Sequence, residues 1–192
     1  MGIFKNKKKP KSIDGIYKLN SPERLFNYMK DNAQYGYVNK DGDAILYDVN
    51  PKDYRVQSPL DFYNTMVGTC WDQALFEKFI FDTVIRNECK LYYIVQDNLN
   101  CTTHTFIIFK YRNKFYYMEN AFERIKGMYY FKTKEEIFDF VISEMRKDNV
   151  DNGVEVYEIN KDYNTYSKNY TTKTDCSSFM SFCESCELVY KS

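Results

Sequence analysis

The chain of 192 residues has few of the residues that interrupt regular structure, with only 7 glycines and 4 prolines. This scarcity excludes a collagen-like chain or a low-complexity disordered one. An excess of charge of either sign is also missing, because 27 Lys and Arg residues balance 27 Asp and Glu residues. Binding to phosphate backbones needs a cationic excess, so we do not expect nucleic acid as a partner.

Long apolar runs are absent as well, and no stretch approaches the roughly 18 apolar residues that a membrane helix needs. We therefore expect no membrane partner. The N-terminal stretch MGIFKNKKKPKS is basic and lacks the apolar segment of a secretory signal. These features predict a cytoplasmic protein whose six cysteines remain mostly free thiols in a reducing setting.

Aromatic residues are abundant, since 19 Tyr, 15 Phe and 1 Trp make up 18% of the chain. Such side chains favour strands and bury large areas. Ser-Pro pairs at 21–22 and 58–59 are typical of helix starts, and an apolar face predicts a helix from Cys70 to about Asn87. Further along, the patterns predict strands at 90–95, 103–111, 114–118, 129–131 and 154–159, and helices at 134–146 and 175–186.

Helices followed by consecutive strands, with a helix returning to them, predict an α+β domain. We expect residues 14–160 to form this domain. Residues 1–13 are predicted to be a flexible basic N-terminus, and residues 161–192 a C-terminal extension that packs on the same domain.

Cys70 follows Gly68 and Thr69 at the predicted start of a helix. A helix N-terminus presents unpaired N–H groups and the positive end of the helix dipole, which favour a thiolate and can hold an oxyanion. Cys70 is therefore a candidate nucleophile. The alternative is a small buried residue, because free cysteine is among the most buried residue types.

His104 is the only histidine, and it lies near the start of a predicted strand. An imidazole close to Cys70 would take the proton of the thiol, although a half-buried strand histidine bonded to backbone is the alternative. Glu119 ends the next strand, and antiparallel pairing would bring it near His104, where it could orient the ring. Asn120 could do the same with its amide oxygen, and an exposed strand-end carboxylate is the alternative for Glu119.

The order of Cys, His and acid is that of the transglutaminase-like branch of the papain-like thiol enzymes. The sequence resembles this superfamily over roughly residues 20–145, and within it a group of bacterial transglutaminase-like proteins. The resemblance is carried by four motifs, which are YRVQSP (54–59), GTCWDQ (68–73), THTFII (103–108) and YYMENAF (116–122).

The resemblance implies N-terminal helices and a nucleophile helix packed on an antiparallel sheet. It implies that Cys70 is the nucleophile, that His104 is the base and that Glu119 occupies the position of the usual Asp. Glu in place of Asp is a departure from the family, which leaves Asn120 as the other candidate for this position. The resemblance also suggests that Gln57 donates to the oxyanion and that Trp71 packs beside the nucleophile.

The implied chemistry is thiol-dependent acyl transfer on amide bonds of a protein or peptide, with neither cofactor nor metal. Because water is always available, a protease, amidase or deamidase is favoured over a crosslinking transglutaminase. A catalytically inactive binding module with exposed tyrosines is the other function class. Cys183-x-x-Cys186, with Cys176 nearby, lacks the paired ligands of a structural zinc site, and we interpret these cysteines as packing thiols at a helix end.

Overall fold

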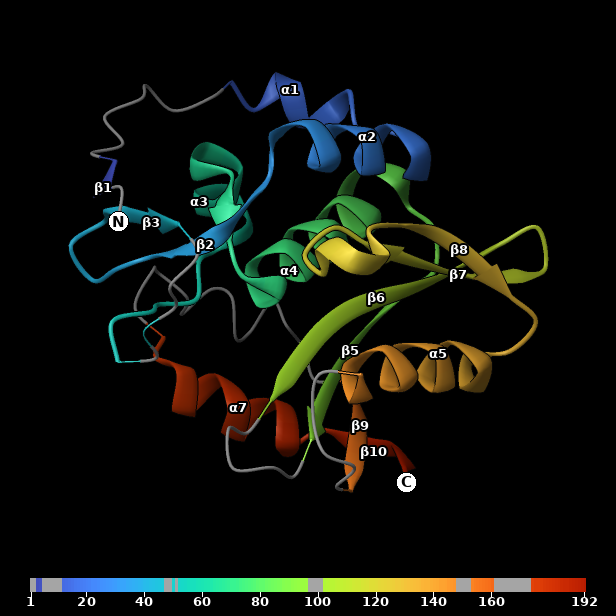
Figure 1. Ribbon diagram of the computed structural model, residues 1–192. Coiled ribbons are helices and arrows are strands. Elements are labelled where there is room, and N and C mark those ends of the chain that lie inside the picture. Colours follow the sequence, from blue (N-terminus) through green and yellow to red (C-terminus); the bar gives the residue numbers. More distant parts are fainter. Residues whose placement is uncertain are drawn as a thin grey trace.

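The computed structural model describes residues 3–4, 12–46, 50, 52–96, 102–147, 153–160 and 174–192. It confirms the predicted α+β class, with helices, a six-stranded antiparallel sheet and a small mixed sheet (Figure 1). Within the described ranges, no helix is long and apolar enough to cross a membrane.

The N-terminal part combines three helices with the small sheet, whose strand order is β1-β3-β2-β4. Ser21 and Ser58 cap helices as predicted, because their hydroxyl oxygens accept bonds from the N–H groups of Arg24 and Asp61. The elements are β1 (Ile3–Phe4), α1 (Asp14–Tyr17), α2 (Pro22–Asn32), β2 (Gln34–Val38), β3 (Ala44–Leu46), α3 (Pro59–Thr65) and β4 (Val67–Gly68).

The central helix α4 (Cys70–Ile80) continues into a π-helical turn, Phe81–Ile85. Almost all of its residues are buried, because α2 and α3 cover one side of it and the large sheet covers the other (Figure 1). A helix that is apolar on most of its circumference is typical of a buried position. The first residue of α4 therefore lies inside the protein, at the junction of the helices and the sheet.

The large sheet has the strand order β10-β9-β5-β6-β7-β8, and all of its neighbours are antiparallel. Five of the strands were predicted to within two residues at each end, whereas β10, part of the expected C-terminal extension, was missed. The strands are β5 (Cys89–Gln96), β6 (Thr103–Tyr111), β7 (Lys114–Glu119), β8 (Gly127–Phe131), β9 (Val154–Glu158) and β10 (Glu187–Lys191).

Alternation along the strands divides the core between the two faces of this sheet. Tyr93 and Ile107 belong to the cluster that contains α4, whereas Tyr92 and Phe106 pack with α5 (Lys134–Arg146) on the other face. Because both faces are covered, the sheet is the middle layer of the protein (Figure 1).

Segments near both ends of the chain pair with strands described above. Near the C-terminus, β10 pairs with β9, and α7 (Cys176–Glu184) places Phe179 against Trp71 with ring centroids 4.5 Å apart. At the other end, Ile3–Phe4 pair with β3. The rest of the predicted flexible N-terminus up to residue 11, and residues 161–173, lie outside the described residues.

Candidate active site

Cys70 is the first residue of α4, because Thr69 caps the helix. The Thr69 hydroxyl oxygen accepts a bond from the N–H of Trp71 at 3.3 Å, and Asp72 Oδ2 accepts one from the N–H of Thr69 at 3.0 Å. This capping box satisfies N–H groups that have no partner within the helix. Cys70 itself is only 7% exposed.

Asp72 links the start of α4 by hydrogen bonds to residues 54–57, which precede the helix in the chain. Its carboxylate is fully buried and accepts bonds from the backbone N–H of Gln57 at 2.8 Å and from the hydroxyl of Tyr54 at 3.0 Å, besides the bond from Thr69. Burial raises the pKa of Asp72 to about 7, although these bonds oppose the rise. The YRVQ and GTCWDQ motifs are thus two halves of one structural unit.

Gly68 is required where it stands, because a Cβ there would lie 2.6 Å from the Cβ of Asp72 and 2.8 Å from the ring of Phe62. The carbonyl of Gly68 accepts a bond from Gln73 Nε2 at 3.1 Å, and Gln57 Nε2 binds the carbonyl of Val67 at 2.7 Å. Two glutamine side chains therefore fix the backbone immediately before the cysteine.

Gln57 is placed differently from the position that its predicted role needs. Its amide nitrogen donates to Val67, and its amide oxygen accepts a bond from the hydroxyl of Thr65 at 2.9 Å. It does not belong to the residues lining the cleft described below. The suggestion that Gln57 donates to an oxyanion has no support in this geometry.

His104 and Glu119 meet at the end of the sheet. The distance between His104 Nε2 and Glu119 Oε2 is 2.7 Å, and both side chains are buried. In the register of β6 and β7, Ile107 pairs with Met118, so the next pair places Glu119 opposite Phe106 and on the face that His104 shares. Since Nε2 faces Glu119, Nδ1 is the other ring nitrogen, and both His104 and Cys70 line the cleft described below.

Glu119 is held by several donors besides His104. Its Oε1 accepts bonds from the backbone N–H groups of Ala121 and Phe122, each at 2.7 Å, and the hydroxyl of Tyr117 donates to Oε2. A carboxylate with this many donors has little freedom to rotate.

The buried pair favours its charged form. Burial alone would raise the pKa of Glu119, but the charge of His104 and the donated bonds outweigh it and hold this pKa below its usual range. Burial likewise opposes charge on His104, yet Glu119 and Cys70 raise the pKa of the imidazole above its usual range. Both directions of shift favour the charged, imidazolium–carboxylate form of this pair.

Asn120, the other candidate for the third position, turns the opposite way. Asn120 is the first residue after β7, and its side chain reaches Glu77 on α4, whereas that of Glu119 reaches His104. Asn120 Nδ2 donates to Oε1 of Glu77 at 2.7 Å. Of the two candidates, Glu119 is the one that binds the imidazole.

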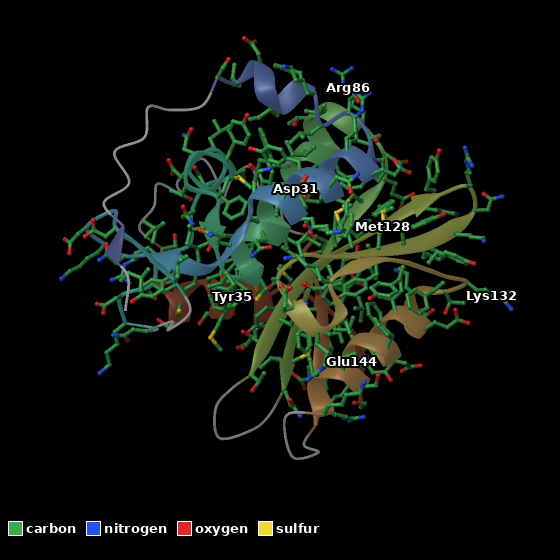
Figure 2. The ribbon with its side chains drawn as sticks, turned by 45° about the horizontal axis from the view of Figure 1, so that its top comes forward. Asp31, Tyr35, Arg86, Met128, Lys132 and Glu144 are labelled. Atoms are coloured by element: carbon green, nitrogen blue, oxygen red, sulfur yellow. The ribbon has the colours of Figure 1, made fainter. Side chains whose placement is uncertain are left out.

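A cleft of about 330 Å³ opens onto Cys70 and His104. It lies where β2, the start of α4, the end of the sheet and α5 meet, and Figure 2 shows Tyr35 on the β2 side and Glu144 on the α5 side. The residues that line it are Tyr35, Cys70, Thr102, Thr103, His104, Ala121, Phe122 and Met145.

Tyr35 and Phe122 are walls of the cleft that sequence reasoning did not identify as functional. Tyr35 pairs with Gly68 through the parallel β2–β4 contact, which brings its ring next to Cys70, and the ring of Phe122 lies 5.9 Å from that of His104. Trp71 follows Cys70 in the chain but points into the core, where it packs against Tyr54 and Phe179.

Metal-ligating side chains do not gather elsewhere in the described residues, where no group of three or more His, Cys, Asp or Glu is placed to hold an ion. The cysteines in and after α7 are free thiols, with Cys183 buried and Cys176 and Cys186 half-buried. Cys101 lies outside the described residues.

No protein-family model matches the chain, and no curated protein sequence matches it.

Proposed function

We propose that the protein is a thiol-dependent acyl-transfer enzyme that acts on amide bonds, with Cys70 as nucleophile, His104 as base and Glu119 as the group that orients His104. The observation that carries the proposal is that one cleft exposes Cys70 beside an imidazole whose far nitrogen is bound to a buried carboxylate. This is the relation between nucleophile, base and orienting group that covalent catalysis needs.

The reaction proceeds in two halves. Cys70 Sγ gives its proton to His104 and attacks the carbonyl carbon of the amide. The C–N bond then breaks, and the imidazolium gives this proton to the leaving amine. Water, activated by the neutral imidazole, then attacks the thioester and releases the acid and the thiol. We favour water over an amine as acceptor because it is always present.

The start of α4 offers a donor for the negative oxygen of the tetrahedral intermediate. Among the described residues, none accepts a hydrogen bond from the backbone N–H of Cys70. This N–H lies at the positive end of an 11-residue helix, where a developing oxyanion is stabilised.

We assign the domain to the papain-like, transglutaminase-like architecture. What supports this is the arrangement of its parts: a nucleophile at the N-terminus of a buried helix, packed on an antiparallel sheet whose neighbouring strands β6 and β7 carry the base and the acid. The α+β class alone would fit many unrelated functions.

The walls of the cleft favour a substrate with an uncharged acyl group. Apart from Cys70 and His104, the described lining residues carry no charge, and Tyr35, Phe122 and Met145 are large and largely apolar. Such walls bury an apolar or amide side chain at little desolvation cost, whereas a charged one would lose its hydration. Proteins or peptides are the substrate class.

Alkylation by iodoacetamide at about pH 6, read by peptide mass spectrometry, tests the proposal. We expect Cys70 to react at least tenfold faster than Cys186, a half-buried thiol that serves as an internal control, and the difference to vanish in His104→Ala. Equal, slow labelling of all thiols would contradict an activated nucleophile and leave a binding module.

A screen of peptide and glutaminyl substrates then separates the acceptors. Ammonia or amine release without incorporation of an added primary amine indicates hydrolysis, and Cys70→Ala is the control that must abolish it. Incorporation of the amine at the same rate as release would identify a crosslinking enzyme instead.

A further inference from the structure

Glu77 is a buried carboxyl group close to the site that the proposed reaction does not use. It lies on α4 two turns beyond Cys70, on the same side of the helix, and is 2% exposed. Its Oε1 accepts a hydrogen bond from Asn120 Nδ2 at 2.7 Å.

Asn120 has an unsatisfied atom at this contact. Its Oδ1 is buried and, among the described residues, receives no hydrogen bond. A buried acceptor without a donor is unfavourable, and an ionised carboxylate cannot supply one because it only accepts. A protonated carboxyl group can donate, and an acid and a primary amide can pair through two parallel hydrogen bonds.

The charges around Glu77 also disfavour its ionised form. The titratable groups whose charges act on Glu77 are Glu119 and Tyr117 on β7, His104 on β6 and Cys89 on β5. His104, the one cation among them, already pairs with Glu119. Burial raises the pKa of Glu77 to about 8 and Glu119 adds to the rise, whereas the bond from Asn120 and the charge of His104 oppose it.

We propose that Glu77 is a neutral acid in the resting protein and donates its proton to Asn120 Oδ1, forming a two-bond acid–amide pair that positions the turn holding Glu119. Asn120 lies between Glu119 and the two N–H groups, of Ala121 and Phe122, that bind Glu119 Oε1. Glu77 is therefore a positioning residue, and this part of the inference rests on the proposed function, whereas its protonation does not.

The pair implies a change at alkaline pH. When Glu77 loses its proton, one hydrogen bond to Asn120 is lost and a second negative charge appears near Glu119. The turn loosens, and the imidazolium of His104 gains a second attractive charge. Cys70 reactivity should then change in a second step near pH 8.

Glu77→Gln is the matched variant, because glutamine can make both bonds to Asn120 but cannot titrate. In an infrared difference spectrum at about pH 6.5, we expect wild type minus Glu77→Gln to contain a carboxylic-acid carbonyl band that disappears above about pH 9. Asp72 contributes to both proteins and cancels. A difference spectrum with a carboxylate band alone at about pH 6.5 overturns the proposal.

The protonation of Glu77 can also be measured on wild-type protein, without a variant. With glutamate labelled at its carboxyl carbon, we expect one resonance to titrate with a midpoint near 8. Titration of every glutamate below about pH 6 overturns the proposal.

The positioning role is read from the alkylation rate of Cys70. Glu77→Gln should keep this rate within about twofold of wild type at about pH 6.5 and lack the alkaline step, whereas Glu77→Ala should lower it at least fivefold. A fivefold loss in folded Glu77→Gln would mean that the ionised form acts, and would overturn the proposal. If Cys70 of the wild type is unreactive, the proposed function fails while the spectroscopic result on Glu77 still stands.

Discussion

Asp72 and Glu119 are both buried carboxylates that accept several hydrogen bonds, yet the protein uses them in opposite ways. Asp72, at the start of α4, has only neutral donors around it, and burial raises its pKa to about 7. Glu119, at the end of β7, faces His104, and its pKa is lowered. Hydrogen bonds make a buried carboxyl group tolerable, but an opposite charge is needed to keep it ionised.

The difference divides the region into a scaffold and a reactive part. The bonds of Asp72 run to backbone and to Tyr54, away from the cleft, and they fix where α4 begins. Glu119 binds a side chain that lines the cleft. Mutations in the scaffold should therefore cost stability first, and mutations in the reactive part should cost reactivity first.

The largest effect is expected for His104→Ala. Without the imidazole, Cys70 loses its base, so its alkylation at about pH 6 should fall by roughly 10²-fold or more. Quantitative mass spectrometry of the Cys70 peptide measures the rate, with circular dichroism as the check on folding. An unchanged rate in folded protein would place Cys70 with the inert thiols.

Asp72→Ala should be the most destabilising of these changes. It leaves the N–H groups of Gln57 and Thr69 and the hydroxyl of Tyr54 without their acceptor, which should lower the free energy of unfolding by about 3 kcal/mol. Urea denaturation measures this, with Asp82→Ala as control. Asp82, in the π-helical turn after α4, forms a surface ion pair with Lys78, and its loss should cost under about 1 kcal/mol. Equal losses of unfolding free energy in the two variants would contradict the structural role of Asp72.

Glu119→Gln should lower the reactivity of Cys70 more than the stability of the fold. Glutamine keeps the size of the side chain but removes the charge that stabilises the imidazolium, so Cys70 alkylation should fall about tenfold or more. The lowered pKa of Glu119 means that its ionisation stabilises the folded state above the unfolded value of about 4.3, and that this contribution is lost as pH falls below it. Urea denaturation between about pH 3 and 6 should show a shallower loss in Glu119→Gln. Wild-type reactivity in this variant would contradict the role of Glu119.

Glu77 should have the opposite pH dependence. Its pKa is raised to about 8, so the folded state binds this proton more tightly than the unfolded chain does, and stability falls as pH rises from about 4.3 to about 8. Relative to wild type, Glu77→Gln should gain at least about 1 kcal/mol in unfolding free energy between about pH 5 and 9. Urea denaturation at both pH values measures the gain, and a constant difference would show that Glu77 does not titrate in this range.

Gln57→Ala should have the smallest effect on reactivity. Its side chain holds Val67 and Thr65 and stays out of the cleft, so we expect a loss of about 1 kcal/mol in stability with Cys70 alkylation within twofold of wild type. Turnover of a peptide that the wild-type protein cleaves measures the effect of Gln57→Ala on catalysis directly. A loss of turnover of 10²-fold would restore Gln57 as an oxyanion donor.

Local patterns sufficed for much of the fold. The helix starts at Ser21 and Ser58 follow from capping residues, the start of α4 follows from its apolar pattern, and most strands of the large sheet follow from alternation. The last strand, β10, was missed because its residues pair only with β9, a long-range contact that a short segment does not encode.

Only the part of the candidate site that shows in residue type and in position along the chain could be predicted from the sequence. Cys70, His104 and Glu119 stand out by residue type and by position at element ends, and the register of β6 and β7 brings the last two together. The choice of Glu119 over Asn120 needed the direction of the side chains at the end of β7. Tyr35 could not have been predicted as a cleft residue, because no local sequence pattern indicates that β2 pairs with β4.

The contact between Trp71 and Phe179 gives the protein a built-in optical reporter. Trp71 is the only tryptophan of the chain, so intrinsic indole fluorescence arises from this one place in the core. Detachment of α7 would bring water to the indole and shift its emission to longer wavelength even if the sheet stayed intact. Docking of the C-terminal helix can thus be followed in solution, with unmodified protein, separately from global unfolding.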